Sequence, residues 1–297
     1  MSAPRKYWVS DHEGIPKETL TIFNEYLLSL KLENKAEATI IKYRNVLRGF
    51  LSECTIPLKE LTAEIVLKWL NVNSTNKKAG TIIHTHATLT SFFNFCLEEG
   101  YMDDVVIKKR WRPKLPHSLP QFLNEQDYTR VKIASELLSA RDRAIVLFLF
   151  SSGCRRSEVS GLTLKDIDLG KRTAKVTGKG NKSRQVHFSD ECAYALKEYL
   201  KIRKKNDSEY LFISRFGGGL GTKGIYDITI ELGIKAGLNK SLNPHSCRHT
   251  FATRMLAKGA SLEFIADELG HTNLNTTRVY AQIPSEDIIA AYLNKMG

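Results

Sequence analysis

Apolar side chains recur at helical spacing through the first third of the chain. Residues 22–30 and 40–51 each carry apolar positions three and four residues apart, the repeat of an amphipathic helix. Thr62 is a good N-cap for a third helix, and residues 82–97 predict a fourth. Four helices of about 10–17 residues joined by short polar loops predict a small bundle, with the aromatic positions as core rather than as a base-stacking platform. The stripes are Ile22, Phe23, Tyr26, Leu27 and Leu30; Ile40, Tyr43, Val46, Leu47, Phe50 and Leu51; Val66, Trp69 and Leu70; and Ile82, His86, Leu89, Phe93 and Leu97.

Beyond residue 120 the pattern changes to helices mixed with short strands. A nearly continuous apolar run at 144–150 predicts a buried helix that ends near Gly153. Residues 173–176 and 184–188 are typical of strands, and the basic, glycine-containing segment between them predicts a β-hairpin with a long tip. The predicted fold class is mainly α with a small β-hairpin or sheet, as an N-terminal helical bundle followed by a mixed α+β domain. Further helices are predicted at about 190–204, 221–236, 245–258, 261–269 and 285–295, with 217–219 as a flexible connection.

The length of 297 residues predicts two domains. We expect an N-terminal extension at 1–16, a helical domain at 17–105, a basic linker at 106–120 and a second domain at 121–297. Prolines in the linker prevent a continuous helix, and basic side chains surround Trp111. The segment suits a strap along a phosphate backbone, where each cation releases counterions, although a solvated charge run has the same pattern. The basic residues of the strap are Lys108, Lys109, Arg110, Arg112 and Lys114.

The net charge is concentrated in the second part of the chain. Residues 1–104 hold 12 Lys and Arg against 13 Asp and Glu, whereas residues 105–297 hold 32 against 19. This asymmetry favours a polyanionic partner on one face, although a basic soluble surface has the same composition. No apolar run is long enough for a membrane span and the first residues lack a secretory signal, so we expect no membrane partner. Five cysteines without a CxxC pair favour a reducing compartment over a disulfide framework or a cysteine-rich metal site.

Five short motifs in the second part supply what DNA cleavage without a metal requires. They read Ser-Gly-Cys-Arg-Arg-Ser-Glu at 152–158, Gly-Lys-Gly at 178–180, His-Ser-Cys-Arg-His at 245–249, Leu-Gly-His at 269–271 and Thr-Thr-Arg-Val-Tyr at 276–280. Breaking a phosphodiester needs a nucleophile, positive charge at the non-bridging oxygens and a proton for the leaving 5′-oxygen. Tyr280 is the candidate nucleophile, but a free phenol has a pKa of about 10 and needs neighbours that favour its ionisation. Arg155 and Arg248 can each bind a phosphate through two N–H groups, which lysine cannot reproduce.

The basic side chains of the fourth motif fall on one helical face. His245, Arg248 and His249 are spaced i, i+3 and i+4, and Pro244 suits the start of a helix whose N-terminus can face a phosphate. Zinc also uses the spacing His-x-x-x-His, but the metalloprotease pattern needs glutamate where Ser246 stands. The Gly-Lys-Gly motif lacks the remaining residues of a nucleotide-binding P-loop. We therefore expect neither a metal nor another cofactor.

In this order and at these spacings, the motifs resemble the tyrosine recombinase (phage integrase) family, from about residue 121 to the C-terminus. Residues 17–105 are similar to the helical core-binding domain of that family, which closes over one side of the DNA. The resemblance implies that 121–297 is the catalytic domain. It also implies six catalytic residues: Arg155, Lys179, His245, Arg248, His271 and Tyr280.

The same resemblance implies roles for the residues around the nucleophile. Lys179 at the hairpin tip would donate the proton to the leaving oxygen, with Lys182 as the alternative, and His271 would bind a non-bridging oxygen. Arg156 stands where the family usually has an apolar residue, so two adjacent arginines compete for one role; the Ser-Glu that follows favours Arg155. The expected supporting residues are Glu158 and His249, and the expected DNA contacts outside the strap are Arg156, Lys182 and Arg184.

The implied function is site-specific recombination through a 3′-phosphotyrosine. A homo-tetramer would synapse two double-stranded DNA sites in the cytoplasm, at the nucleoid, and exchange strands in pairs. Integration, excision and dimer or cointegrate resolution stay open, as do a mobile-element origin and the need for a partner recombinase or an accessory protein. The alternatives are a type IB topoisomerase, which relaxes DNA without sequence choice, and a non-catalytic DNA-binding regulator, which has no need of Tyr280. Residues 285–297 are expected either to pack on their own domain or to dock on a neighbouring protomer.

Overall fold

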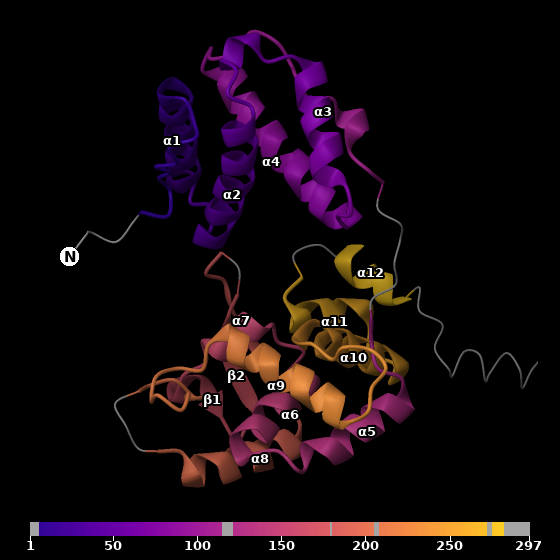
Figure 1. Ribbon diagram of the computed structural model, residues 1–297. Helices are drawn as coiled ribbons and strands as arrows, with labels where there is room; N and C mark the ends of the chain where they lie inside the picture. Colours follow the sequence, from indigo (N-terminus) through magenta and orange to yellow (C-terminus); the bar gives the residue numbers. More distant parts are fainter. Residues whose placement is uncertain (1–5, 115–120, 179, 205–207, 272–274, 282–297) are drawn as a thin grey trace, which may run out of the picture. The chain divides into compact units, whose positions relative to one another are not determined.

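The chain forms two compact units, residues 1–117 and 118–297. Both are mainly helical, and the second contains a small three-stranded antiparallel sheet, which confirms the predicted fold class (Figure 1). The computed structural model of the chain describes residues 6–114, 121–178, 180–204, 208–271 and 275–281.

The first unit is a bundle whose helices follow the predicted stripes. Thr62 caps α3 as expected, since its side chain accepts a hydrogen bond from the Ile65 amide. The aromatic side chains of the stripes lie in the core: Phe23 and Phe50 have no exposed surface, and Phe93 is 1 % exposed. The last helix is longer than predicted, at 20 residues. The helices are α1 (Lys17–Leu32), α2 (Glu37–Glu53), α3 (Ala63–Ser74) and α4 (Ala79–Glu98), with 3₁₀ turns η1 (Leu58–Glu60) and η2 (Lys109–Trp111).

The packed core of the first unit extends beyond residue 105 into the segment expected to be linker. Val106 and Ile107 are buried in it, and Trp111 packs against it. The imidazole Nε2 of His86 lies 3.1 Å from the carbonyl oxygen of Lys108. The basic side chains of the strap are nevertheless exposed along this stretch: Lys108, Lys109, Arg110, Arg112 and Lys114.

The second unit is built around α6, which is buried on all sides over residues 144–150. The run 144–150 lies in the core, as its apolar character predicts, and α6 packs against both α8 and α10. Gly153 ends α6 in the left-handed conformation, with φ of 61°. A Cβ there would lie 2.5 Å from the Phe251 ring and 2.8 Å from Leu269, so only glycine allows this close approach of α6 to α10 and α11.

Several elements of this unit were not expected from the sequence. The helices α7 and α12 span five and seven residues, too few for an apolar repeat, and β1 has only two residues. The helix predicted at 285–295 lies outside the described residues. The elements are α5 (Glu125–Ser135), α6 (Ala140–Ser152), α7 (Arg156–Ser160), η3 (Leu164–Asp166), β1 (Ile167–Asp168), β2 (Thr173–Thr177), β3 (Ser183–His187), α8 (Asp190–Ile202), α9 (Thr222–Lys235), α10 (Pro244–Ala257), α11 (Leu262–Leu269) and α12 (Asn275–Ala281).

The sheet has the strand order β1-β2-β3, and β2 and β3 form the predicted hairpin. Val176 pairs with Arg184, which sets the register of the hairpin. In β3 the inner positions are Arg184, half-buried, and Val186, fully buried. Arg184 therefore lies on the inner face of the hairpin and not on its solvent face.

The triple glycine at 217–219 forms a hydrogen-bonded turn, so its prediction as a flexible connection was wrong. The Ser214 amide donates to the Gly218 carbonyl at 2.7 Å, and Ile213 bridges to Gly219. A Cβ at Gly219 would lie 2.8 Å from the ring of Tyr210. Glycine is needed at that position because the aromatic ring lies directly on the backbone.

No helix within the described ranges is both long and apolar enough to cross a membrane. In the same ranges, no group of three or more His, Cys, Asp and Glu side chains could hold a metal ion. All five cysteines lie in the described ranges, and each is a free thiol. Burial raises the pKa of the Cys154 thiol to about 12, so this thiol stays protonated at neutral pH.

Candidate active site

The start of α10 is fixed by the two residues that precede the motif. The side-chain oxygen of Asn243 accepts hydrogen bonds from the amides of His245 and Ser246, at 3.0 and 3.1 Å. Pro244 occupies the first helical turn, where its missing N–H costs nothing. The cap leaves His245 exposed on the first turn and Arg248 buried one turn later.

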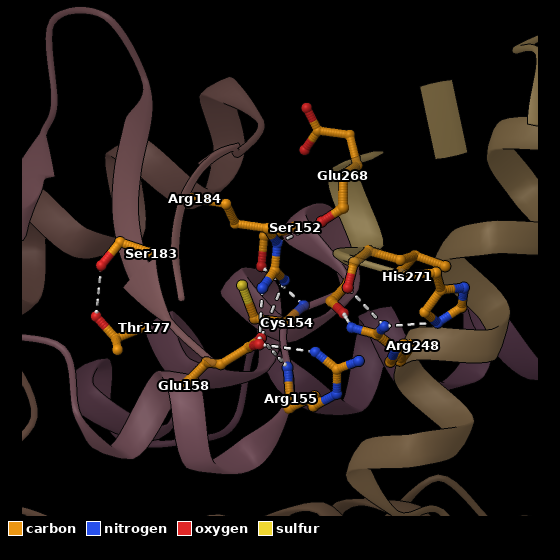
Figure 2. A network of polar contacts seen from close by, with 12 residues as sticks. Ser152, Cys154, Arg155, Glu158, Thr177, Ser183, Arg184, Arg248, Glu268 and His271 are labelled. Carbon is orange, nitrogen blue, oxygen red and sulfur yellow. Dashed lines mark hydrogen bonds and ion pairs between the residues drawn. The ribbon is translucent and has the colours of Figure 1, made fainter. Parts of the chain in front are cut away.

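Arg248 connects the ends of two other helices. Its guanidinium donates to the carbonyl oxygens of Gly153 and Leu269, each at 2.7 Å, and its Nη2 lies 2.9 Å from His271 Nε2 (Figure 2). Burial and the nearby charge of Arg155 lower the pKa of Arg248 to about 10, so it is still charged at neutral pH. Arg248 thus holds the turns that precede Arg155 and His271 at one place.

His271 is held as a neutral imidazole of one tautomer. A guanidinium can only donate, so Nε2 of His271 accepts the hydrogen bond from Arg248. The ring proton then lies on Nδ1, which is 2.8 Å from the hydroxyl oxygen of Thr277. Burial, together with the charge of Arg248, lowers the pKa of His271 to about 4. His271 is therefore uncharged at neutral pH and links α11 to α12.

Arg155 is held by a buried carboxylate. Glu158 is 2 % exposed, and its carboxylate accepts from the Arg155 amide at 2.7 Å and from the Arg155 guanidinium at 2.9 Å. It also accepts two hydrogen bonds from Arg184, at 2.7 and 3.0 Å (Figure 2). Burial would raise the pKa of Glu158, but the hydrogen bonds from Arg184 and Arg155 outweigh it, and the pKa is lowered. Glu158 is thus ionised and shared between two arginines.

Tyr280 lies in a small apolar cluster with its hydroxyl on His249. The side chain is 2 % exposed and packs with Phe251, Ile265 and Leu269. The hydroxyl oxygen lies 2.8 Å from His249 Nδ1. Burial lowers the pKa of His249 to about 4 and raises the pKa of Tyr280, which the charge of Arg248 partly offsets. The neutral imidazole therefore accepts the hydrogen bond and the phenol donates it.

The structure brings together some of the predicted site residues and separates others. Arg248 is hydrogen-bonded to His271 and to the carbonyl oxygen of Gly153, two residues before Arg155. Arg155 itself is held by Glu158, and the Tyr280 hydroxyl is hydrogen-bonded to His249. The predicted proton donor, Lys179, lies outside the described residues. Of the expected DNA contacts in this unit, the exposed ones are Arg156, which lies 5.8 Å from the Tyr226 ring, and Lys182.

Sequence reasoning missed two contacts of this site. His249 was expected as a supporting residue, but its contact with the Tyr280 hydroxyl was not predicted. Arg184 was expected to bind DNA, yet its guanidinium points inward at Glu158. A signal for Arg184 was present in the strand, because the apolar Val186 stands two residues further on and marks the inner face.

The family of the chain follows from its similarity to known proteins. Residues 121–286 match the phage integrase family. The chain is 34% identical over 275 residues to tyrosine recombinase XerA of Pyrococcus horikoshii, covering 90% of each chain. It is 32% identical over 286 residues to tyrosine recombinase XerC of Oceanobacillus iheyensis, covering 91% of this chain and 93% of the relative. The chain belongs to the phage integrase family of tyrosine recombinases. It is an enzyme that breaks and rejoins DNA in site-specific recombination.

Solved structures of recombinases share the fold. The crystal structure of XerA recombinase aligns with a TM-score of 0.55 at 27% identity, over 94% of this chain and 99% of that one. A post-cleavage complex of XerH recombinase with its difH substrate aligns with a TM-score of 0.74 at 21% identity, over 97% and 92% of the two chains. The family assignment and the relatives named XerA and XerC place the chain with the recombinases.

Proposed function

We propose that Tyr280 attacks the scissile phosphate to form a 3′-phosphotyrosine and a free 5′-hydroxyl, which the 5′-end of a partner strand later reverses. The observation that carries the proposal is the convergence of two arginines and a histidine beside the tyrosine helix. Arg248 binds the turn before Arg155 and the turn before His271, and His271 binds α12, which carries Tyr280. Four separate sequence motifs meet in this way at one place.

The two arginines are suited to different parts of phosphate binding. Arg155 is about one third exposed, and its guanidinium keeps donors that Glu158 does not use. Arg248 is buried, and its hydrogen bonds to Gly153, Leu269 and His271 leave it with further donors of the five that a guanidinium carries. Positive charge fixed before the reaction at the non-bridging oxygens lowers the barrier without reorganisation.

To donate a hydrogen bond to a non-bridging oxygen, His271 has to gain a proton on Nε2. In the DNA-free chain its Nε2 accepts from Arg248 and carries no hydrogen. A bound phosphate would compete for the Arg248 guanidinium, and its negative charge would raise the pKa of the imidazole. Binding of DNA would then release Nε2 from Arg248 and favour a proton on it.

The remaining proposed roles concern protonation and DNA binding. Lys179, at the tip of the β2–β3 hairpin, would protonate the leaving 5′-oxygen, with the exposed Lys182 as the alternative. His245, at the start of α10, would contribute another donor to the phosphate. The first unit with its strap would bind the duplex, and the second unit would carry out the reaction.

The proposed biological reaction is exchange between two double-stranded sites within a homo-tetramer. Relatives that share 31–34% of their residues with this chain carry the names XerC and XerA, which favours a Xer-like recombinase of cytoplasmic DNA at the nucleoid. Integration or excision of a mobile element uses the same chemistry, and a partner recombinase or accessory protein would decide the direction.

The decisive experiment uses a nicked suicide substrate, from which the cleaved 5′-end diffuses away and traps the covalent adduct. The wild-type protein should form an adduct that maps to Tyr280. Tyr280→Phe removes only the hydroxyl, so it should keep DNA binding in a gel shift and form no adduct. Tyr226→Phe is a matched control, because that tyrosine lies on α9 outside the cluster around Tyr280. Wild-type adduct levels in Tyr280→Phe would disprove the assignment.

A further inference from the structure

Arg184 makes three hydrogen bonds to two parts of the catalytic unit, although its strand position gave no sign of these partners. Two N–H groups of its guanidinium donate to the two carboxylate oxygens of Glu158, at 2.7 and 3.0 Å. Its Nε donates to the carbonyl oxygen of Glu268, the next-to-last residue of α11, at 3.0 Å (Figure 2). The side chain is 16% exposed, so it is mostly shielded from solvent.

Two motif glycines lie against this ion pair. A Cβ at Gly178, the residue before Lys179, would lie 3.0 Å from Glu158 Oε1. A Cβ at Gly270, the residue before His271, would lie 3.0 Å from the Arg184 side chain. A side chain at either glycine would therefore crowd the Arg184–Glu158 pair.

We propose that Arg184 is a positioning residue for recombination, and that it sets the places of Arg155 and His271 relative to each other. It acts on Arg155 through the carboxylate of Glu158, which both arginines share. It acts on His271 through the Glu268 carbonyl and through Gly270, which lies on its guanidinium. The inference rests on the proposed function, in which Arg155 and His271 bind the scissile phosphate.

A second contact supports the idea that β3 positions the end of α11. His187, on the same strand as Arg184, has its Nδ1 2.6 Å from Glu268 Oε1, and its amide donates to Glu268 Oε2 at 3.3 Å. Glu268 is thus held by β3 through both its main chain and its side chain, two residues before Gly270. A shift of the strand would move the turn that carries His271.

Lysine cannot replace arginine in this arrangement. The planar guanidinium reaches two carboxylate oxygens and a carbonyl oxygen in fixed directions, whereas an ammonium is a point charge without that geometry. Arg184→Lys would keep the charge opposite Glu158 but would leave the carboxylate held mainly by Arg155, so the position of both side chains would be less fixed. A displacement of about 1 Å can cost roughly 100-fold in rate even when the altered residue is remote from the chemistry.

The test compares two DNA substrates, one with an ordinary scissile phosphate and one with a scissile methylphosphonate, in which a non-bridging oxygen is replaced by a methyl group. Release of the 5′-hydroxyl fragment is measured for the wild-type protein and for Arg184→Lys. On phosphate we expect the variant to be about 10- to 100-fold slower. On methylphosphonate the loss should be several-fold smaller, because there is less negative charge for a misplaced Arg155 to neutralise.

Controls separate this inference from the proposed function and from a loss of folding. Arg155→Ala should also lose less cleavage rate on methylphosphonate than on phosphate. If it does not, the role of Arg155 in the proposed function is wrong. Arg172→Lys is the matched control, since Arg172 pairs with Asp190 on the surface, and it should cleave both substrates like the wild type. Thermal unfolding by circular dichroism shows whether each variant is folded.

Gly178→Ala provides a second variant that retains every charge of the site. Its methyl group would press on Glu158 and should give a similar loss, again smaller on methylphosphonate. If Arg184→Lys does not fold, the comparison of the two substrates is made with Gly178→Ala alone. The inference would be overturned if Arg155→Ala loses less rate on methylphosphonate than on phosphate, while the folded Arg184→Lys and Gly178→Ala proteins lose the same factor on both substrates. Arg184 would then be a stabilising residue only.

Discussion

His249 Nδ1 lies 2.8 Å from the hydroxyl oxygen of Tyr280, so the proposed nucleophile is hydrogen-bonded to a neutral imidazole before DNA is present. Burial keeps the phenol protonated and the imidazole uncharged, since it raises the pKa of Tyr280 and lowers that of His249. The phenol can lose its proton to His249 only where new surroundings stabilise the charges that result. Approach of a phosphate and the arginines around it would supply that change.

The first prediction is a measurable coupling between these two side chains. Tyr280→Phe and His249→Ala each remove one partner, and the double variant should be less destabilised than the sum of the two by about 0.5–1.5 kcal/mol, the net value of one hydrogen bond. The local stability of α10 and α12 is measured by amide hydrogen exchange in the wild type, the two single variants and the double variant, and the coupling energy follows from these four values. Strictly additive effects would mean that the contact contributes nothing in solution.

The second prediction concerns stability between pH 7 and pH 5. The pKa values of His249 and His271 are both lowered from 6.5 to about 4 by burial, so the unfolded chain takes up protons in this range and the folded chain does not. The stability that these neutral imidazoles contribute is complete above about pH 6.5 and is lost as the pH falls towards 4. The melting temperature of the wild-type protein should therefore fall from pH 7 to pH 5. The fall should be smaller in His249→Gln and His271→Gln, and an equal fall in all three would contradict the pKa assignments.

The third prediction tests the link between His271 and the tyrosine helix. Thr277 is fully buried, and its hydroxyl oxygen lies 2.8 Å from His271 Nδ1. Thr277→Val keeps the shape but leaves the ring N–H without its acceptor, so adduct formation should slow by about 10-fold, equivalent to about 1.4 kcal/mol. Thr277→Ser retains the hydroxyl and should stay near the wild-type rate. If both variants react alike, the hydrogen bond has no role in placing His271.

Much of the fold and of the site could be predicted because the signals were local. The apolar repeats of the bundle, the burial of 144–150 and the spacing of His245, Arg248 and His249 all lie within single helices. A repeat of 3.6 residues is visible in any one segment. The motifs around Arg155 and His271 were equally compact.

What could not be predicted depends on contacts between distant segments. Arg184 meets Glu158 across 26 residues and the Glu268 carbonyl across 84, so its strand alone gave no sign of either partner. The contact of His249 with Tyr280 spans 31 residues and requires α12, which is too short for an apolar repeat. Alternation within β3 could place Arg184 on the inner face, but only packing of α11 against the hairpin supplies the group it binds.

A fourth prediction is that cleavage needs no metal ion. In the proposed site the guanidinium groups of Arg155 and Arg248 supply the positive charge that metals supply in other nucleases. Adduct formation on the suicide substrate should therefore proceed at the same rate in excess EDTA as in magnesium. Loss of cleavage in EDTA with recovery on addition of magnesium would show that the arginines are not sufficient.

The last prediction assigns the proton of the leaving 5′-oxygen to Lys179 rather than to Lys182. The hairpin carries both lysines beyond the Thr177–Ser183 pair that closes its ladder, and Lys182 is exposed. Lys179→Ala should slow adduct formation by roughly 10²–10⁴-fold, the usual contribution of a general acid, whereas Lys182→Ala should change DNA affinity more than rate. A substrate with sulfur at the 5′-bridging position has a leaving group that needs no proton, so it should restore the rate of Lys179→Ala. If a lysine only binds phosphate, its alanine variant should lose the same factor in rate on the sulfur substrate as on the oxygen substrate. Rescue confined to Lys182→Ala would therefore move the role to that residue, and rescue of neither would remove the hairpin lysines from proton transfer.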